Sequence, residues 1–94
     1  MNLEQIIKEG KGTIVDVRTR EEFSGGNAVG SINIPLNEVQ QRLEEIKNLE
    51  SPIVLCCASG GRSGQATMFL TQQGIDCSNA GSWMDVNFYK SQTI

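Results

Sequence analysis

The stretch IVLCCASGGRSGQA (53–66) decides the fold, because it joins an apolar strand, a glycine-rich turn and the start of a helix. Ile53 to Cys57 form an unbroken apolar run, which is typical of a strand covered on both faces of a parallel sheet. A turn between such a strand and a helix points backbone N–H groups at one spot and favours an anion there. The sequence therefore predicts an anion-binding loop with Cys57 at its mouth.

Short strands alternate with amphipathic segments on both sides of this stretch. Thr19 and Glu22 have the spacing of a capping box, which predicts a brief helix behind the first strand. The alternation predicts an α/β domain with a mainly parallel sheet, helices on both of its faces, and ligands beyond the carboxyl ends of the strands. The expected elements are helices near 3–7, from Thr19, over 37–49 with Asn37 as cap, and over 63–73, and strands at 13–17, 31–34, 53–57 and 75–78.

Length and charge restrict the classes of protein that fit this chain. Its 94 residues suffice for one modest core, so we expect a single domain over residues 1–94. A net charge of -3 without a lysine or arginine cluster argues against a nucleic-acid partner. No segment resembles a signal peptide or reaches the about 18 to 20 apolar residues of a membrane span. We therefore expect a cytoplasmic protein that has neither nucleic acid nor a membrane as its partner.

The chain has no histidine and three cysteines, two of them adjacent. An odd number of thiols does not form a disulfide framework, and a reducing compartment keeps them free. Without histidine there is no Cys–His dyad, and without a CxxC pair the cysteines lack the spacing of zinc or iron–sulfur ligands. We therefore expect no metal and no cofactor, and a reactive cysteine must be activated by local electrostatics.

Four motifs in order resemble those of the single-domain rhodaneses, the thiosulfate sulfurtransferase family. They are IVDVRTREEF (14–23), GSINIP (30–35), IVLCCASGGRSGQA (53–66) and NAGSW (79–83). The combination of SGQA and NAG is most similar to the small phage-shock type of bacterial rhodanese. The resemblance implies a rhodanese-like three-layer sandwich, with a mainly parallel sheet between two layers of helices.

The same resemblance implies an enzyme that moves sulfane sulfur from thiosulfate, or another persulfide donor, to cyanide or a thiol. In that family the loop cysteine attacks the donor and carries a persulfide, which assigns the nucleophile to Cys57. The implied partners are a small anionic sulfur donor and a thiol or cyanide acceptor, and a thiol-carrying protein is a further candidate. This chemistry suits the loop, because a reactive thiolate needs a lowered pKa and its reaction partners are anions.

The loop after Cys57 supplies the expected substrate-binding groups. Ser63 is expected mainly to cap the following helix, with a hydroxyl directed at the loop as the second possibility. Arg62 is expected either to hold the sulfonate end of the donor or to pair with a carboxylate such as Asp16, and both alternatives stay open. The expected substrate-binding residues are Ala58, Ser59, Gly60, Gly61, Arg62 and Ser63.

Three residues outside the loop are expected to support it. Asp16 and Arg18 occupy alternate positions at the end of the first strand, so both face the same side, where bracing the loop is favoured over substrate contact. Trp83 follows the last expected strand, and an interior position is favoured over the wall of the pocket. Two positions depart from the family's pattern, since Asn27 replaces a common histidine and Ser82 replaces a glycine. These departures leave the acceptor preference open.

A second register competes with the one that starts at Cys57. Counting from Cys56 yields Cys-x5-Arg62-Ser, the spacing of phosphatase and arsenate-reductase loops, which close around a tetrahedral oxyanion. In that register Leu55 stands where phosphatases usually place histidine. We favour Cys57 and predict that Cys56 points to the other face of the sheet. The other alternative is a non-catalytic carrier that holds a persulfide on Cys57 for a partner protein.

Overall fold

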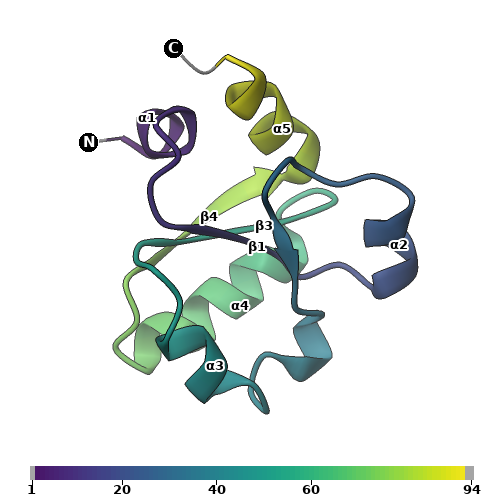
Figure 1. Cartoon of the computed structure of the whole chain (residues 1–94). Helices are drawn as coiled ribbons and strands as arrows, with labels where there is room; N and C mark the ends of the chain where they lie inside the picture. Colours follow the sequence, from purple (N-terminus) through teal and green to yellow (C-terminus); the bar gives the residue numbers. More distant parts are fainter. Residues whose placement is uncertain (1, 93–94) are drawn as a thin grey trace.

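The computed structural model describes residues 2–92 and contains a parallel sheet of four strands between two layers of helices (Figure 1). Its strands lie in the order β2-β1-β3-β4, and each neighbouring pair is parallel. Residues 1, 93 and 94, the ends of the domain expected over 1–94, lie outside the described residues. The strands are β1 (Thr13–Asp16), β2 (Ile32–Asn33), β3 (Ile53–Cys57) and β4 (Cys77–Ser82).

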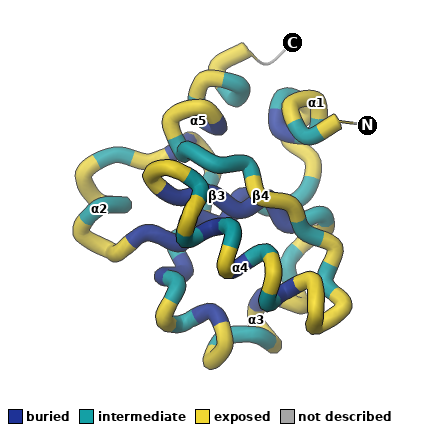
Figure 2. Tube along the Cα trace, turned by 180° about the vertical axis from the view of Figure 1, so that it is seen from behind, coloured by how far each residue is buried: buried dark blue, intermediate teal, exposed yellow. Residues whose placement is uncertain are grey.

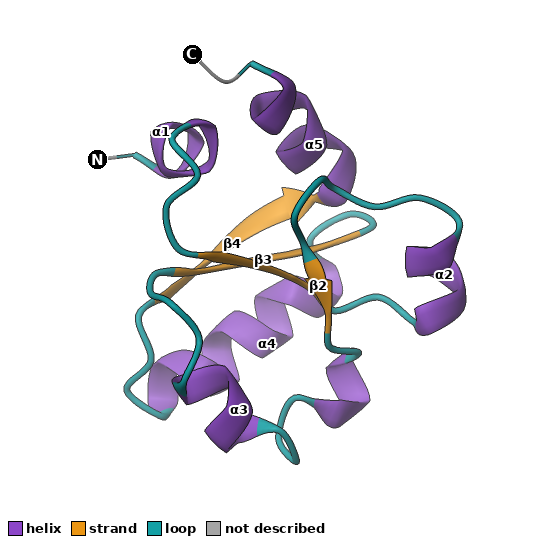
Figure 3. Cartoon of the chain, in the orientation of Figure 1, coloured by secondary structure: helices purple, strands orange, loops and turns teal. Residues whose placement is uncertain are grey.

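Helices cover both faces of the sheet, so the predicted α/β sandwich is confirmed (Figure 3). One layer contains α1 (Leu3–Lys8) and α5 (Trp83–Ser91), and the other contains α3 (Leu43–Lys47) and α4 (Gly61–Gln72). The short α2 (Arg20–Ser24) follows β1 at the edge of these layers. Within residues 2–92, no helix has the length and apolar character needed to cross a membrane.

Strand β3 contributes to two separate cores, because it has a neighbouring strand on either side and helices above and below. Val54 and Cys56 join the core beneath α1 and α5, whereas Leu55 and Cys57 join the core beside α3 and α4. The central strands form the most continuous buried stretch of the chain (Figure 2). The prediction that Cys56 and Cys57 point to opposite faces is therefore confirmed.

The capping box predicted for α2 is present. The hydroxyl of Thr19 accepts a hydrogen bond from the Glu22 amide at 3.2 Å, and Glu22 Oε1 accepts one from the Thr19 amide at 3.0 Å. Asn27 lies just beyond this helix and donates from its side chain to the Phe23 carbonyl at 2.9 Å. These bonds give α2 defined ends although it is only five residues long.

The helix expected over 37–49 is divided into a 3-10 turn, η1 (Leu36–Glu38), and α3. Asn37 caps neither element, since η1 follows Pro35 and α3 follows Arg42, both without a side-chain cap. The Leu36 amide is hydrogen-bonded to the Val17 carbonyl at 3.0 Å, which ties the start of the segment to the first strand. The break itself lies at residues 39–42, which form turns and divide the helix that the apolar periodicity predicts.

The C-terminal part differs most from the sequence prediction. The strand expected at 75–78 is instead β4, and the helix α5 after it was not predicted. The closing motif NAGSW ends β4 and begins α5, with the Ser82 hydroxyl accepting from the Met84 amide at 3.1 Å. A register shift between β3 and β4 lies beside Leu55 and Cys56. Serine, asparagine and glycine are poor strand formers, which explains why the sequence pattern hid this edge strand.

Candidate active site

Cys57 ends β3, and its sulfur lies beneath the loop that leads into α4. The Gly60 amide donates a hydrogen bond to Cys57 Sγ at 3.0 Å, and the Ser63 hydroxyl lies 3.3 Å from the same atom. The residue is only 1% exposed. A backbone donor and a side-chain donor therefore converge on one buried sulfur.

Gly60 gives the loop its shape. Its φ of 107° is in the left-handed region, and a Cβ there would lie 3.3 Å from the Gly81 Cα, so a side chain at this position would be both strained and crowded. Gly60 is also the N-cap of α4, which begins at Gly61 instead of at the expected Ser63. Because the chain turns two residues earlier than predicted, Ser63 lies inside the helix, and its expected role as cap is wrong.

The sulfur of Cys57 is set up to ionise near neutral pH. Burial opposes the charge, but hydrogen bonds from the Ser63 side chain and from the amides of Ser63, Gly60 and Ser59 outweigh it and lower the pKa to about 7. Among the other residues expected to bind substrate, Ala58 and Gly61 are exposed parts of the loop. The structure thus brings Ser59, Gly60 and Ser63 to the sulfur.

The neighbouring thiol has a different environment. Cys56 is fully buried in the core that contains Ile7 and Val86, on the face of the sheet opposite Cys57. Burial, and to a smaller extent the charge of Asp16, raises the pKa of Cys56 to about 12. Cys56 therefore lacks the hydrogen-bond donors that a phosphatase-type nucleophile needs.

Arg62 forms a bidentate ion pair with Glu22. Its Nη1 lies 2.7 Å from Glu22 Oε1, and its Nη2 lies 3.0 Å from Glu22 Oε2. Of the two alternatives for Arg62, the structure therefore contains the carboxylate pair, but the partner suggested by the sequence is wrong. Asp16 is unavailable because its carboxylate is already bound by Arg18.

Asp16 and Arg18 form a buried ion pair that holds α2 in place. Arg18 Nη2 lies 2.8 Å from Asp16 Oδ2, and the two side chains are 5% and 0% exposed. The same guanidinium donates to the carbonyls of Glu22 at 3.3 Å and Gly26 at 2.7 Å. The pair thus connects the end of β1 to the middle of α2 at Glu22 and to the turn after α2 at Gly26.

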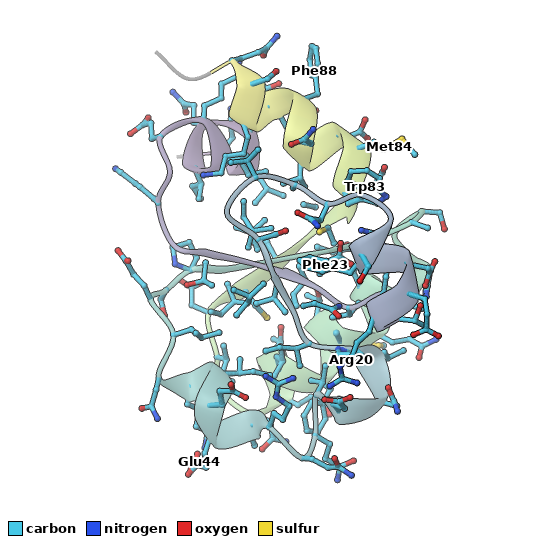
Figure 4. The ribbon with its side chains drawn as sticks, turned by 45° about the vertical axis from the view of Figure 1, so that its right-hand side comes forward. Arg20, Phe23, Glu44, Trp83, Met84 and Phe88 are labelled. Carbon is cyan, nitrogen blue, oxygen red and sulfur yellow. The ribbon has the colours of Figure 1, made fainter. Side chains whose placement is uncertain are left out.

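Trp83 covers this ion pair from the other side. The Arg18 guanidinium carbon lies 4.6 Å from the centroid of the Trp83 ring, a cation–π contact. The ring also packs on Gly26, where a Cβ would approach it to 3.1 Å. Trp83 is half-buried at the edge of the core beneath α1 and α5, whereas Met84 and Phe88 point outward from α5 (Figure 4).

Asn79, a residue for which the sequence pattern predicts no role, contacts the loop from β4. Its Oδ1 lies 2.7 Å from the Ser63 hydroxyl and accepts from the Gly81 amide at 2.9 Å, while its Nδ2 donates to the Gly60 carbonyl at 3.0 Å. Asn79 therefore contacts both groups that lie against the sulfur of Cys57, and its Oδ1 shares the single hydroxyl proton of Ser63 with that sulfur. In the sequence, Asn79 is the first residue of the NAGSW motif, and its side-chain amide can both donate and accept hydrogen bonds.

The proteins similar to this chain include two curated proteins and one solved structure. The uncharacterized protein YqhL of Bacillus subtilis is 41% identical over 64 residues, which are 68% of this chain and 50% of YqhL. The thiosulfate sulfurtransferase PspE of Escherichia coli is 34% identical over 74 residues, 77% of this chain and 71% of PspE. The crystal structure of reduced Bacillus anthracis CoADR-RHD superimposes with a TM-score of 0.76 at 31% identity, covering 94% of this chain and 15% of that one.

The chain thus spans half the length of YqhL and a small part of the Bacillus anthracis protein. The rhodanese-like domain matches residues 2–87, and the chain therefore belongs to the rhodanese-like domain family.

Proposed function

We propose that this protein is a sulfurtransferase in which Cys57 takes a sulfane sulfur from thiosulfate, or another persulfide donor, and passes it to cyanide or a thiol. The observation that carries the proposal is the convergence of the Gly60 amide and the Ser63 hydroxyl on Cys57 Sγ, at 3.0 and 3.3 Å. Membership of the rhodanese-like domain family supports the class of reaction. The description of PspE as a thiosulfate sulfurtransferase supports the choice of donor.

In the first half of the proposed reaction the Cys57 thiolate attacks the outer sulfur of thiosulfate. A bond forms between the two sulfur atoms, the sulfur–sulfur bond of thiosulfate breaks, and sulfite leaves with the bonding electron pair. The product is a Cys57 persulfide anion, so total charge is conserved and no proton is transferred. The donors around Cys57 Sγ stabilise the thiolate that makes this attack.

In the second half a cyanide ion or a thiolate attacks the outer sulfur of the persulfide. The bond between the outer sulfur and Cys57 Sγ breaks, thiocyanate or a new persulfide leaves, and the Cys57 thiolate is regenerated. Neither half needs a general acid or base, which agrees with a chain that has no histidine. The pKa of about 7 keeps a large share of Cys57 ionised at neutral pH.

The test is mass spectrometry of the protein after treatment with thiosulfate, together with an assay for thiocyanate. We expect one added sulfur atom, on the peptide that contains Cys57, and thiocyanate formation when cyanide is supplied. Cys57→Ser should abolish both signals, whereas Cys56→Ser, the matched control, should largely spare them. The opposite pattern of the two variants would contradict the proposal.

The same experiment separates the alternatives. A persulfide on Cys57 with negligible turnover would identify a carrier that needs a partner protein as its acceptor. Hydrolysis of an aryl phosphate without any persulfide would favour the phosphatase register. The high pKa of Cys56 argues against that second outcome.

A further inference from the structure

Arg62 lies in the first turn of α4, directly after the loop that surrounds Cys57, and a carboxylate of the same chain already occupies its guanidinium. Both oxygens of Glu22 contact it, at 2.7 and 3.0 Å. The planar fork of an arginine binds two oxygens of one acid group, and a sulfonate presents the same pair of oxygens as a carboxylate. Glu22 therefore occupies the pair of donors on Arg62 that a sulfonate group could use.

Glu22 is held in this position from two further directions. Its Oε1 accepts from the Thr19 amide at 3.0 Å, as part of the capping box of α2. Its backbone carbonyl accepts from Arg18 at 3.3 Å, and Arg18 is itself fixed by Asp16. A donor must therefore displace a carboxylate that is already ordered, which makes the competition more costly than it would be against a mobile side chain.

We propose that Glu22 is a specificity-determining residue, which competes with the sulfonate group of thiosulfate for Arg62 and so disfavours dianionic donors. The inference rests on the proposed function of Cys57. Donors that carry less charge at the end remote from the transferred sulfur depend less on Arg62. The competition from Glu22 therefore lowers their affinity by a smaller factor. Methanethiosulfonate is such a donor, since a methyl group replaces one oxygen of thiosulfate and removes one negative charge.

The variant that tests this is Glu22→Gln. Glutamine is also a capping-box residue, so α2 keeps its N-terminal hydrogen bond while the charge opposite Arg62 is removed. The half-exposed pair has side chains that are 35% and 36% exposed, which limits the expected effect to about three- to fivefold. We expect the concentration of thiosulfate that gives half-maximal persulfide formation to fall by that factor, and the value for methanethiosulfonate to change by less than about twofold.

Glu38→Gln is the matched control. Glu38 also pairs with arginines, at 2.6 Å from Arg20 and 3.2 Å from Arg42, so the variant removes the same charge from a pair outside the loop. It should leave the thiosulfate dependence unchanged. A fall equal to that of Glu22→Gln would mean that net charge alone is responsible, and it would overturn the proposal.

The dependence on Arg62 is tested by a double-mutant cycle. If Glu22 acts by occupying the guanidinium, Glu22→Gln should have no effect on the thiosulfate dependence in an Arg62→Gln background. An equal effect in that background would show that the carboxylate repels thiosulfate by its charge alone, without acting through Arg62, and the inference would be wrong. Glu22→Ala is the second variant, in case Glu22→Gln does not fold. It should lower the thiosulfate concentration needed for half-maximal persulfide formation in the same way. Its melting temperature should be lower, because it also lacks the capping side chain of α2.

A second readout does not require sulfur transfer. Sulfate should protect Cys57 from alkylation by iodoacetamide, and it should do so at about three- to fivefold lower concentration in Glu22→Gln than in the unmodified chain. Unchanged protection would overturn the inference even if persulfide chemistry is observed. Improved protection without any persulfide would instead retain Glu22 as the competitor for Arg62 and refute the sulfurtransferase proposal.

Discussion

Cys56 and Cys57 are adjacent on β3, and both are almost completely buried, with exposed fractions of 0% and 1%. Burial raises the pKa of Cys56 to about 12, whereas the hydrogen bonds at the end of the strand lower that of Cys57 to about 7 despite its burial. Exposure therefore does not distinguish the two thiols. The hydrogen-bond donors around a sulfur, and the face of the sheet on which the sulfur lies, therefore decide whether it becomes a nucleophile.

The largest expected difference between the two cysteines is in their rates of alkylation. At pH 8 the pKa values of about 7 and about 12 predict thiolate fractions that differ on the order of 10⁴-fold. Iodoacetamide should therefore label Cys57 with a rate that rises as the pH passes through about 7, while Cys56 stays unlabelled. Peptide mapping by mass spectrometry measures both sites.

Unfolding in urea provides the control for this measurement. It should make the two cysteines react at similar rates, because the difference depends on the folded environment. Comparable labelling of Cys56 and Cys57 in the folded protein would contradict the assignment of the nucleophile.

A smaller effect is expected when one of the hydrogen-bond donors around Cys57 is removed. Ser63→Ala removes the hydroxyl that lies 3.3 Å from Cys57 Sγ, so the pKa of Cys57 should rise. A rise of about one on the pH scale makes persulfide formation about tenfold slower at pH 6 but nearly unchanged at pH 9, where either thiol is mostly ionised. Rates of persulfide formation at the two pH values check this.

Thr71→Ala is a suitable control for the loss of a hydroxyl. Thr71 lies on the same helix, and its Oγ1 is 3.4 Å from the sulfur of Cys77 instead of Cys57. It should leave the pH dependence of Cys57 unaltered. An equal slowing of Ser63→Ala at both pH values would mean that the hydroxyl does not act through ionisation.

The smallest expected effect comes from removing the other thiol. Cys56→Ala deletes a sulfur that lies in the core beneath α1 and α5, on the face of the sheet opposite Cys57. The free energy of unfolding should fall by about 1 kcal/mol, as is usual for a small cavity, while the rate of persulfide formation changes by less than about twofold. Urea unfolding and the persulfide assay measure the two quantities separately, and a large loss of rate would show that the two faces of β3 are coupled.

The elements that were predicted well are those that depend on nearby residues. The apolar run of β3, its glycine-rich turn and the capping box of Thr19 and Glu22 are all local patterns, and the structure contains each of them. Their order was sufficient for the α/β class. The helix α5 was missed because the polar β4 before it concealed where the last strand ends.

The contacts around Cys57 depend on residues that are distant in the sequence. Glu22 is 40 positions from Arg62, and Asn79 is 16 positions from Ser63. Local patterns therefore assigned Glu22 only to a cap, and they suggested the wrong carboxylate for Arg62. The partner could not be deduced without knowing that Arg18 already occupies Asp16.

The two edges of the sheet have a consequence for self-association. An exposed strand with free backbone groups can pair with a second chain, and long, flat, apolar edges do so most readily. Here β2 has only two residues, and β4 reads CSNAGS with a register shift along its length. Both edges are thus poor templates for intermolecular pairing. The same polar, irregular strand that presents Asn79 to the loop therefore also makes aggregation through this edge of the sheet unfavourable.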